Sequence, residues 1–386
     1  MQVNFAYTGQ GKLFYVQDGK AREIESEFAQ EMQDRAMRVQ QSRSWKNRDE
    51  PTMFGGRSLW GISPSADQPL QIEITSAAKA GNSLYYFLQT RQVGALCRYD
   101  LEEKEERRIF HRENFHGRDL AHHPEEDKIA FALQLPDGTS NIAVMPTETR
   151  DQREVTEGDG VDMAPAWIPG SKTRLVFQSA GVARAEEGYI VGLGPFAINT
   201  LDTESGELTT ELEDAQHDLL SPRYDGAGNL YFIRRPYEGM GRPGFQPLTM
   251  LTDIVFFPFR LLVAFFHFLN AFSLFFAKKP LTNADGPRNP PVKVQRVELW
   301  GKMIDLQKLT NEHKTGEIPS LVPATWELVK RAPDGIETIL ARNVASFDLT
   351  PAGEVVYSNG RKARWIGNDS AGVSAASGLM ERVLVV

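Results

Sequence analysis

The stretch RDLAHHPEEDKIAFALQLPDGTSNIAVM (118–145) decides the fold, because three other parts of the chain repeat its order of residues. An Asp and two apolar residues are followed by a Pro, a turn and an apolar strand that ends near a second turn. The same order is found in VDMAPAWIPGSKTRLVFQSAG (161–181), HDLLSPRYDGAGNLYFIRR (217–235) and FDLTPAGEVVYSNGRKARWIG (347–367). Internal repeats of this kind are typical of arrays such as solenoids and propellers.

Each repeat is predicted to be a β-meander. Apolar and polar residues alternate in IAFAL, RLVFQS, NLYFIR and EVVYSN, and Gly, Pro, Asn or Asp bounds each run. A looser fifth copy covers 72–112. A sixth is divided between the chain ends: VNFAYTG, KLFYVQDG and KAREIES supply three strands, and MERVLVV (380–386) supplies the missing first strand. We therefore expect both termini to complete one blade, which avoids long exposed sheet edges.

Two of these stretches, APAWIPGSKTRLVFQSAG (164–181) and DGTSNIAVMPTETRDQREVTEG (137–158), resemble the repeats of TolB-like six-bladed β-propellers. The resemblance covers most of the chain outside 26–66 and 237–320, and it implies fold more than function. The turns depart from the family's usual Ser-Pro-Asp-Gly. We expect an all-β, single-domain, six-bladed β-propeller over 1–386, closed by N- and C-terminal strands in one blade and carrying a helical amphipathic insertion.

Composition narrows the class of protein further. Among 386 residues, Lys and Arg number 43 against 51 Asp and Glu, a net charge of −8 that does not suit a general nucleic-acid binder. The single cysteine, Cys97, excludes an internal disulfide framework and Cys-rich metal sites. The opening MQVNFAYTGQGKLFYV lacks the features of a secretory signal, so we expect a cytoplasmic protein.

A helical connector is predicted between two blades, over 26–48. Ser26 can cap a helix in which Phe28, Met32 and Val39 lie near one face. Its far end is basic, with Arg35, Arg38, Arg43, Lys46 and Arg48 around Trp45. One interpretation is a solvated helix packed across the ring; a contact with phosphate or lipid headgroups is the other.

The repeats predict an insertion over 237–320. Its centre, LTDIVFFPFRLLVAFFHFLNAFSLFF (251–276), holds nine of the chain's 22 Phe. The length suits a membrane-spanning helix, but both ends must return to one blade and no second apolar stretch carries the chain back. Asp253, Arg260, His267 and Asn270 instead form a narrow polar stripe opposite a broad apolar face, which predicts a helix lying in the membrane interface.

The residues expected to contact lipid or a membrane protein are the apolar face and the first cations after it, which anionic lipid attracts. They are Phe256, Phe257, Phe259, Arg260, Leu261, Leu262, Phe265, Phe266, Phe268, Leu269, Phe272, Phe275, Phe276, Lys278 and Lys279. Packing on the propeller's own flank, a dimer interface, or docking against a partner's transmembrane helices are alternatives, since so large an apolar face is not left to water.

Four acidic residues, Asp119, Asp162, Asp218 and Asp348, begin equivalent first strands and are predicted to line the central channel. They can hold a cation or a basic peptide end, or accept backbone N–H groups and tie neighbouring blades together. The histidines of HRENFHGRDLAHHP (111–124) fit no established metal spacing. No nucleophile elbow, phosphate loop or dinucleotide motif is found, so we expect no catalytic residue, no cofactor and no metal.

The sequence thus favours a non-enzymatic scaffold held at the cytoplasmic face of a membrane by 251–276, where it recruits an unidentified protein partner. It predicts no nucleic-acid partner. A subunit of a larger assembly, with the same helix buried against protein, is the alternative. An enzyme built from the Asp and His groups at the channel mouth is a third interpretation.

Overall fold

The computed structural model describes residues 4–46, 70–239, 296–300, 302–305, 320–350, 353–367 and 371–386. The chain divides into two compact units, Met1–Tyr237 with Val297–Val386, and Glu238–Arg296. The elements described below belong to the first unit, apart from the first residue of β19. The predicted apolar helix 251–276, with all of its candidate contact residues, lies outside the described residues.

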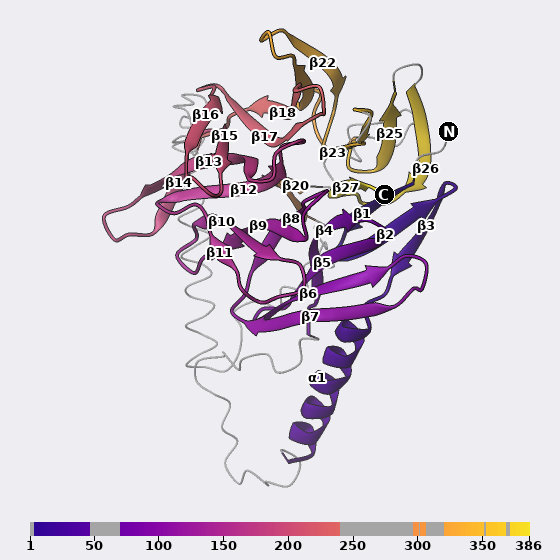
Figure 1. Cartoon of the computed structure of the whole chain (residues 1–386). Helices are drawn as coiled ribbons and strands as arrows, with labels where there is room; N and C mark the ends of the chain where they lie inside the picture. The colour runs from indigo at the N-terminus through magenta and orange to yellow at the C-terminus, as the bar shows by residue number, and fades with distance from the viewer. Residues whose placement is uncertain are drawn as a thin grey trace, which may run out of the picture. The chain divides into compact units, whose positions relative to one another are not determined.

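Four-stranded meanders follow one another along the chain (Figure 1). We call them blades 1 to 6. Blade 1 contains β1 (Phe5–Gly9), β2 (Lys12–Gln17), β3 (Lys20–Ile24) and the last strand, β27 (Arg382–Val385). Blade 2 contains β4 (Glu73–Ala80), β5 (Ser83–Gln89), β6 (Val93–Asp100) and β7 (Glu106–Glu113). Blade 3 contains β8 (Gly117–His122), β9 (Lys128–Gln134), β10 (Ser140–Pro146) and β11 (Arg153–Glu154).

The remaining blades follow the same order. Blade 4 contains β12 (Gly160–Trp167), β13 (Arg174–Arg184), β15 (Ala197–Asp202) and β16 (Leu208–Leu212), with β14 (Ile190–Leu193) paired to the far end of β13. Blade 5 contains β17 (His217–Tyr224), β18 (Leu230–Pro236), β21 (Glu327–Arg331) and β22 (Glu337–Arg342). Blade 6 contains β23 (Ser346–Leu349), β24 (Val355–Ser358), β25 (Lys362–Ile366) and β26 (Ala371–Ser377).

The apolar faces of successive blades pack against each other, and this packing forms the core. In the cluster between blades 2 and 3, Phe87 meets Phe131 with ring centroids 5.2 Å apart, edge to face. Similar clusters join blade 1 to blade 2 and blade 6 to blade 1. The alternation seen in the sequence is therefore explained by burial between sheets, and the resulting architecture is that of a β-propeller.

The two ends of the chain meet in blade 1. Strand β1 pairs with β27 in antiparallel register, with Tyr7 opposite Val383. Strand β27 also contacts β23 of blade 6 and β4 of blade 2. Val383 is 4% exposed and packs with Phe5 and Met380 in the cluster between blades 6 and 1. The C-terminal strand is thus packed on both sides. Just before it, Glu381 accepts the N–H of Gln10 across 371 positions of the sequence.

The helical connector begins where the sequence predicts it. Helix α1 (Glu27–Lys46) has Ser26 before its first turn, and Ser26 Oγ accepts the N–H of Ala29 at 3.1 Å. Glu106 of β7 accepts the N–H of Phe28 at 3.0 Å and the hydroxyl of Ser26 at 2.7 Å. A carboxylate at this end suits the helix dipole and satisfies free N–H groups.

Only the first turns of α1 pack on blade 2. Phe28 is buried under the guanidinium of Arg108, which lies 4.4 Å from its ring centroid. Val39 is 46% exposed, so it does not share the packed face that the sequence assigns to it. Figure 1 shows α1 extending away from blade 2. The side-chain periodicity placed Val39 on the same face as Phe28 and Met32, but the docked face of the described part of α1 ends before Met37 and Val39, which are 52% and 46% exposed.

The predicted insertion leaves and re-enters blade 5. Strands β18 and β21 are neighbours in the sheet, with Phe232 opposite Val329. Between them the structure describes a short hairpin, β19 (Arg296–Leu299) with β20 (Lys302–Asp305), which the sequence did not predict. Among the helices of the described residues, none is long and apolar enough to cross a membrane.

The packing of β27 gives a testable expectation for stability. In Val383→Asp a charge without a partner enters the apolar cluster between blades 6 and 1, which should lower the unfolding free energy by roughly 3 kcal/mol or more. Leu208→Asp, the same kind of change at a residue that is 57% exposed, should stay within about 0.5 kcal/mol. Urea unfolding followed by circular dichroism measures both; equal midpoints would show that β27 contributes little.

Candidate functional site

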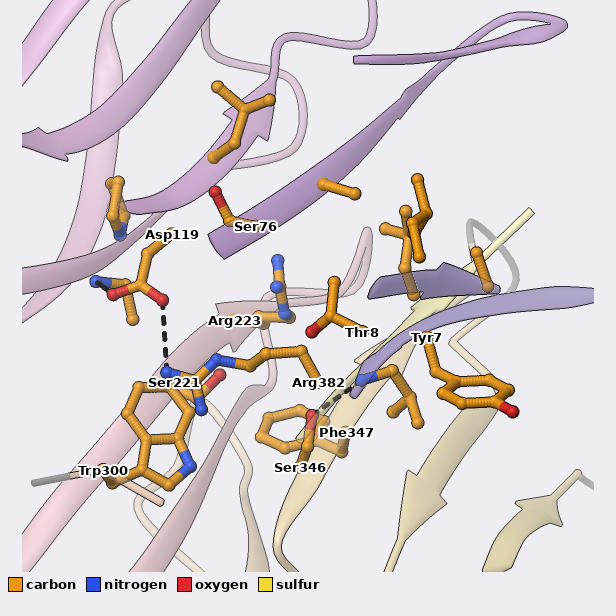
Figure 2. A pocket seen from close by; sticks show the side chains of 18 residues that line it. Tyr7, Thr8, Ser76, Asp119, Ser221, Arg223, Trp300, Ser346, Phe347 and Arg382 are labelled. Atoms are coloured by element: carbon orange, nitrogen blue, oxygen red, sulfur yellow. Dashed lines mark hydrogen bonds and ion pairs between the residues drawn. The ribbon is translucent and has the colours of Figure 1, made fainter. Parts of the chain in front are cut away.

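A central pocket lies where the innermost strands of all six blades meet (Figure 2). Its walls come from β27 and β1, β4, β8, β12, β17 and β23, and Trp300 at the β19–β20 turn completes them. The volume is about 50 Å³. That is room for a few waters or one small polar group.

Bulges shape the strands that surround this pocket. In β8, β12 and β17 the pairing register shifts between Arg118 and Ala121, Met163 and Ala166, and Leu220 and Arg223. Inside each bulge one residue has a positive φ: Asp119 (50°), Ala164 (52°) and Ser221 (53°). A bulge re-aims the side chains that follow it. This repeated irregularity is why side chains of the innermost strands reach the pocket.

Asp119 and Arg382 form the first ion pair of the pocket. Arg382 Nη2 donates to Asp119 Oδ1 at 3.2 Å, and the N–H of Ala164 in the next blade donates to Asp119 Oδ2 at 3.2 Å. The guanidinium carbon of Arg382 lies 3.2 Å from the ring centroid of Trp300. Stacking and ion pairing together fix the plane of the guanidinium. Burial lowers the pKa of Arg382, and the group remains a cation.

Arg223 and Asp348 form the second ion pair. Arg223 lines the pocket, and its Nε lies 3.2 Å from Asp348 Oδ1. Asp348 Oδ2 accepts the N–H of Val385 in β27 at 2.8 Å. The carboxylate therefore lies beside the Arg223 cation as an ion pair without hydrogen-bond geometry, and it joins blade 6 to blade 1 through Val385. In both ion pairs the aspartate also holds a backbone N–H of a neighbouring blade.

Trp300 is held firmly although it belongs to the insertion hairpin. Its indole Nε1–H donates to the carbonyl oxygen of Ala345 at 2.9 Å, and its own carbonyl accepts Arg235 Nη2 at 3.0 Å. The residue is 7% exposed. The hairpin is thus fastened to blades 5 and 6 at the side of the pocket.

The four aspartates do not form one ring. Only Asp119 is among the residues that line the pocket. The bulges align Asp119 with Ala164 and Ser221, so Asp162 and Asp218 stand two and three residues earlier in their strands. The three aspartates therefore occupy different positions relative to the same bulge, because the sequence comparison aligned Asp residues rather than the bulges. The alternative role, tying blades through backbone N–H groups, describes Asp119, Asp218 and Asp348.

Asp218 belongs to a buried ion pair beside the pocket. Arg235 Nε donates to Asp218 Oδ2 at 2.8 Å, and the N–H of Phe196 in blade 4 donates to Asp218 Oδ1 at 3.2 Å. The side chains are 4% and 5% exposed. Arg235 also lies 4.8 Å from the ring centroid of Trp326. Removal of one member of such a pair leaves the other charge in a dry environment.

Asp218→Ala should therefore destabilise the protein strongly, by about 3–5 kcal/mol, because the buried ion pair with Arg235 and the link to the N–H of Phe196 are lost together. Asp137→Ala breaks an exposed pair with Arg184 and a turn contact with Thr139 and should cost much less. Chemical unfolding of the two variants measures the contrast. A loss for Asp218→Ala as small as that for Asp137→Ala would contradict the structural role given to the buried pair.

Asp162 lies in a different environment. Its Oδ1 accepts the hydroxyl of Ser179 at 2.6 Å, and its backbone carbonyl accepts the hydroxyl of Ser140 in blade 3 at 2.8 Å. Burial raises the pKa of the Asp162 carboxyl above its ordinary value of 3.8. The folded protein therefore holds this proton more tightly than the unfolded chain does.

A pH dependence follows from this shift. The contribution of Asp162 to stability is complete below pH 3.8 and is lost as pH rises through the raised pKa, since the unfolded chain releases the proton first. Asp162→Asn should be more stable than wild type at pH 7, with a difference that shrinks toward pH 3.8. Asp202 is the control: backbone N–H groups, first that of Ser205, lower its pKa, so Asp202→Asn should be less stable at pH 7. Unfolding midpoints measured against pH give the sign of the stability difference between each variant and wild type. A wild type more stable than Asp162→Asn at pH 7 would contradict the raised pKa of Asp162.

The histidines have structural partners. His123 is 1% exposed; its Nδ1 accepts the N–H groups of Glu125 and Glu126 at 3.0 and 2.9 Å, and its Nε2 lies 3.1 Å from the carbonyl of Ser171. These partners assign the proton to Nε2. His122 stacks on Tyr85, and burial lowers its pKa. In the described parts of the chain no group of three or more His, Cys, Asp or Glu side chains is placed to hold a metal ion.

Cys97 lies in the core of blade 2, beside Tyr86 and Glu106. Burial is the main cause that raises the pKa of the Cys97 thiol. A thiol that stays protonated is a poor nucleophile. The residue therefore behaves as a small apolar side chain.

The sequence interpretation missed Arg223, Arg382 and Trp300. A signal existed for the first two: Arg223 follows the turn Ser-Pro at the bulge of β17, and Arg382 stands inside MERVLVV, which the repeats identify as an innermost strand. An arginine in such a strand faces either the core or the channel. Trp300 has no such signal because no repeat covers the insertion.

Comparison with known proteins supports the fold alone. No family model matches the sequence, and no curated protein matches it. Among solved structures, TolB from Acinetobacter baumannii aligns with 99% of this chain and 65% of its own at a TM-score of 0.50 and 11% identity. A nidogen/laminin complex aligns with 100% of this chain and 98% of its own at a TM-score of 0.49 and 8% identity.

A further structure, a putative TolB from Agrobacterium tumefaciens, aligns with 82% of this chain and 86% of its own at a TM-score of 0.41 and 14% identity. The chain spans 65% of the length of the Acinetobacter TolB chain. Similarity at such low identity concerns architecture and carries no activity or partner. The chain is thus structurally similar to TolB and other six-bladed β-propellers.

Proposed function

We propose that the protein is a non-enzymatic binding propeller, tethered peripherally to the cytoplasmic face of a membrane by its Phe-rich segment 251–276, where it recruits a protein partner. The observation that carries this proposal is the pairing of β18 with β21. Both ends of the insertion start from adjacent strands of one blade. A segment that must return to its starting point suits a helix lying in the membrane surface better than a single span.

In this proposal, the affinity for the membrane comes from the composition of the Phe-rich segment and of the cations that follow it. Nine Phe in 26 residues provide apolar area for the acyl boundary, while Arg260, Lys278 and Lys279 meet anionic headgroups. Each cation near such a surface contributes about 1 kcal/mol. Two further cations, Arg35 and Arg38, are exposed on α1, and in this proposal they add to the attraction of an anionic surface.

The ring itself is the rigid part of the proposed scaffold. We propose that β27 closes the sixfold array, because it pairs with β1 and contacts both β4 and β23. Ion pairs and inter-blade hydrogen bonds hold the pocket side chains in place. Rigid elements are good platforms for binding. Fixed guanidinium groups in a small pocket suit recognition of a ligand more than turnover of a substrate.

Flotation with liposomes tests the tether. Full-length protein should float with anionic vesicles and less with neutral ones, and deletion of 248–281 should abolish flotation. Phe265→Asp with Phe272→Asp should release the protein, because two charges oppose burial of the apolar face. A matched control, Leu208→Asp with Ile336→Asp, charges two exposed apolar residues of the ring and should leave flotation unchanged.

The same experiment addresses the alternative. If neither full-length protein nor the deletion floats while the full-length chain self-associates, then 251–276 is a protein interface, and the protein is a subunit of a larger assembly. Equal flotation of the Phe265→Asp, Phe272→Asp variant and wild type would contradict the assignment of the tether to this segment.

A further inference from the structure

Two arginines in the central pocket have hydrogen-bond donors that no described residue accepts. Among these residues, Arg382 engages Asp119 through Nη2, and Arg223 faces Asp348 with Nε at ion-pair distance but without hydrogen-bond geometry. Within the described residues, Arg382 Nε and Nη1 and both Nη atoms of Arg223 have no hydrogen-bond partner. Both side chains line the pocket and keep 27% and 30% of their surface exposed. Figure 2 shows them among the residues around the cavity.

These guanidinium groups are fixed before any ligand arrives. Trp300 lies against the face of Arg382, and Asp119 and Asp348 are themselves held by the N–H groups of Ala164 and Val385. Little side-chain entropy remains to be lost on binding, so each new hydrogen bond contributes more to affinity. An arginine anchored on one edge presents its other N–H groups as a planar fork, the geometry that matches a carboxylate.

The polar groups of the lining suit an oxygen acceptor. Arg382 and Arg223 each pair with one carboxylate, Asp119 and Asp348, so the guanidinium N–H groups left over, rather than an excess of positive charge, are what the pocket offers to a ligand. Ser76, a wall residue on β4 that is 4% exposed, has a hydroxyl with no hydrogen-bond partner. A buried hydroxyl without a partner is costly, and an oxygen acceptor in the pocket can relieve that cost after a rotamer change.

We infer that the central pocket binds a single carboxylate group, presented by a small organic acid or by the C-terminus of a peptide. A volume of about 50 Å³ admits one such group and little more. A planar carboxylate fits the fork of a guanidinium group and brings one negative charge, whereas a phosphate is tetrahedral and brings up to two negative charges beside arginines that already pair with Asp119 and Asp348. The rest of a peptide would then lie outside, at the mouth of the pocket. This inference rests on the proposed binding role of the ring but does not depend on the membrane tether.

Isothermal titration calorimetry of the full-length protein, without vesicles, tests the site. Sodium acetate and the peptide acetyl-Gly-Gly-Gly with a free C-terminus are the probes, sodium chloride at equal ionic strength is the blank, and acetyl-Gly-Gly-Gly-amide and inorganic phosphate are the competitors of different chemistry. We expect heat of binding with a carboxylate probe and none with the amide. Tighter binding of the free-acid peptide than of acetate assigns the site to a peptide terminus; equal binding assigns it to a small acid.

Variants of the pocket arginines test whether the heat of carboxylate binding arises in the pocket. Arg382→Gln and Arg223→Gln should each weaken carboxylate binding by about tenfold or more, the loss expected for charge-assisted hydrogen bonds. Arg184→Gln is the matched control, because Arg184 is similarly exposed at 24% but pairs with Asp137 and Asp159 outside the pocket. Arg382→Lys keeps the charge without the fork and should give an intermediate loss. If Arg382→Gln fails to fold, Arg223→Gln and Arg382→Lys still decide the question.

Three results would overturn the carboxylate site: no heat with either carboxylate probe, tighter binding of phosphate than of acetate, or unchanged affinity in folded Arg223→Gln and Arg382→Lys. None of these concerns flotation. If the protein floats but binds no carboxylate, the proposed tether stands and the carboxylate site is wrong. If it binds a carboxylate but does not float, the site stands and the tether is wrong.

Discussion

An aspartate carboxylate on one blade that accepts a backbone N–H of a neighbouring blade is the contact on which the centre of the molecule depends. Asp119 holds Ala164, Asp218 holds Phe196, and Asp348 holds Val385. Each of these hydrogen bonds joins two blades near the pocket. The innermost strand of a blade is the edge of its sheet, so a side chain rather than another strand makes the connection there. The same three carboxylates neutralise Arg382, Arg235 and Arg223. The same carboxylates therefore determine both the hydrogen bonds between blades and the charge around the pocket.

Much of the fold could be predicted from local pattern. Alternating residues bounded by turn formers indicate short antiparallel strands, and four similar stretches indicate repetition. The link between the chain ends was visible too, because the N-terminal part supplies three strands of a four-stranded repeat and MERVLVV stands where a further first strand belongs. The strands and turns rest on residues close together in the chain, and the link between the ends follows from counting the strands of each repeat.

The site could be predicted only in part, for physical reasons. The aspartates were found because they repeat, but their register was not, since the equivalent positions of the bulges hold Asp119, Ala164 and Ser221, and only one of these three is an Asp. Arg382 reaches Asp119 across 263 positions of sequence. Neither local stretch of sequence indicates that these two residues are in contact. The predicted apolar contact residues of 251–276 remain a prediction, because they lie outside the described residues.

The place of Trp300 has a consequence for any redesign of this chain. The residue belongs to the insertion by sequence, yet it supplies one wall of the pocket and the surface on which Arg382 lies. Excision of everything between β18 and β21, although those strands would still pair, would take that wall away and leave Arg382 with one support instead of two. The insertion is thus not a separable module that can be removed without changing the ring. Its interior is completed by the very segment that interrupts its repeat.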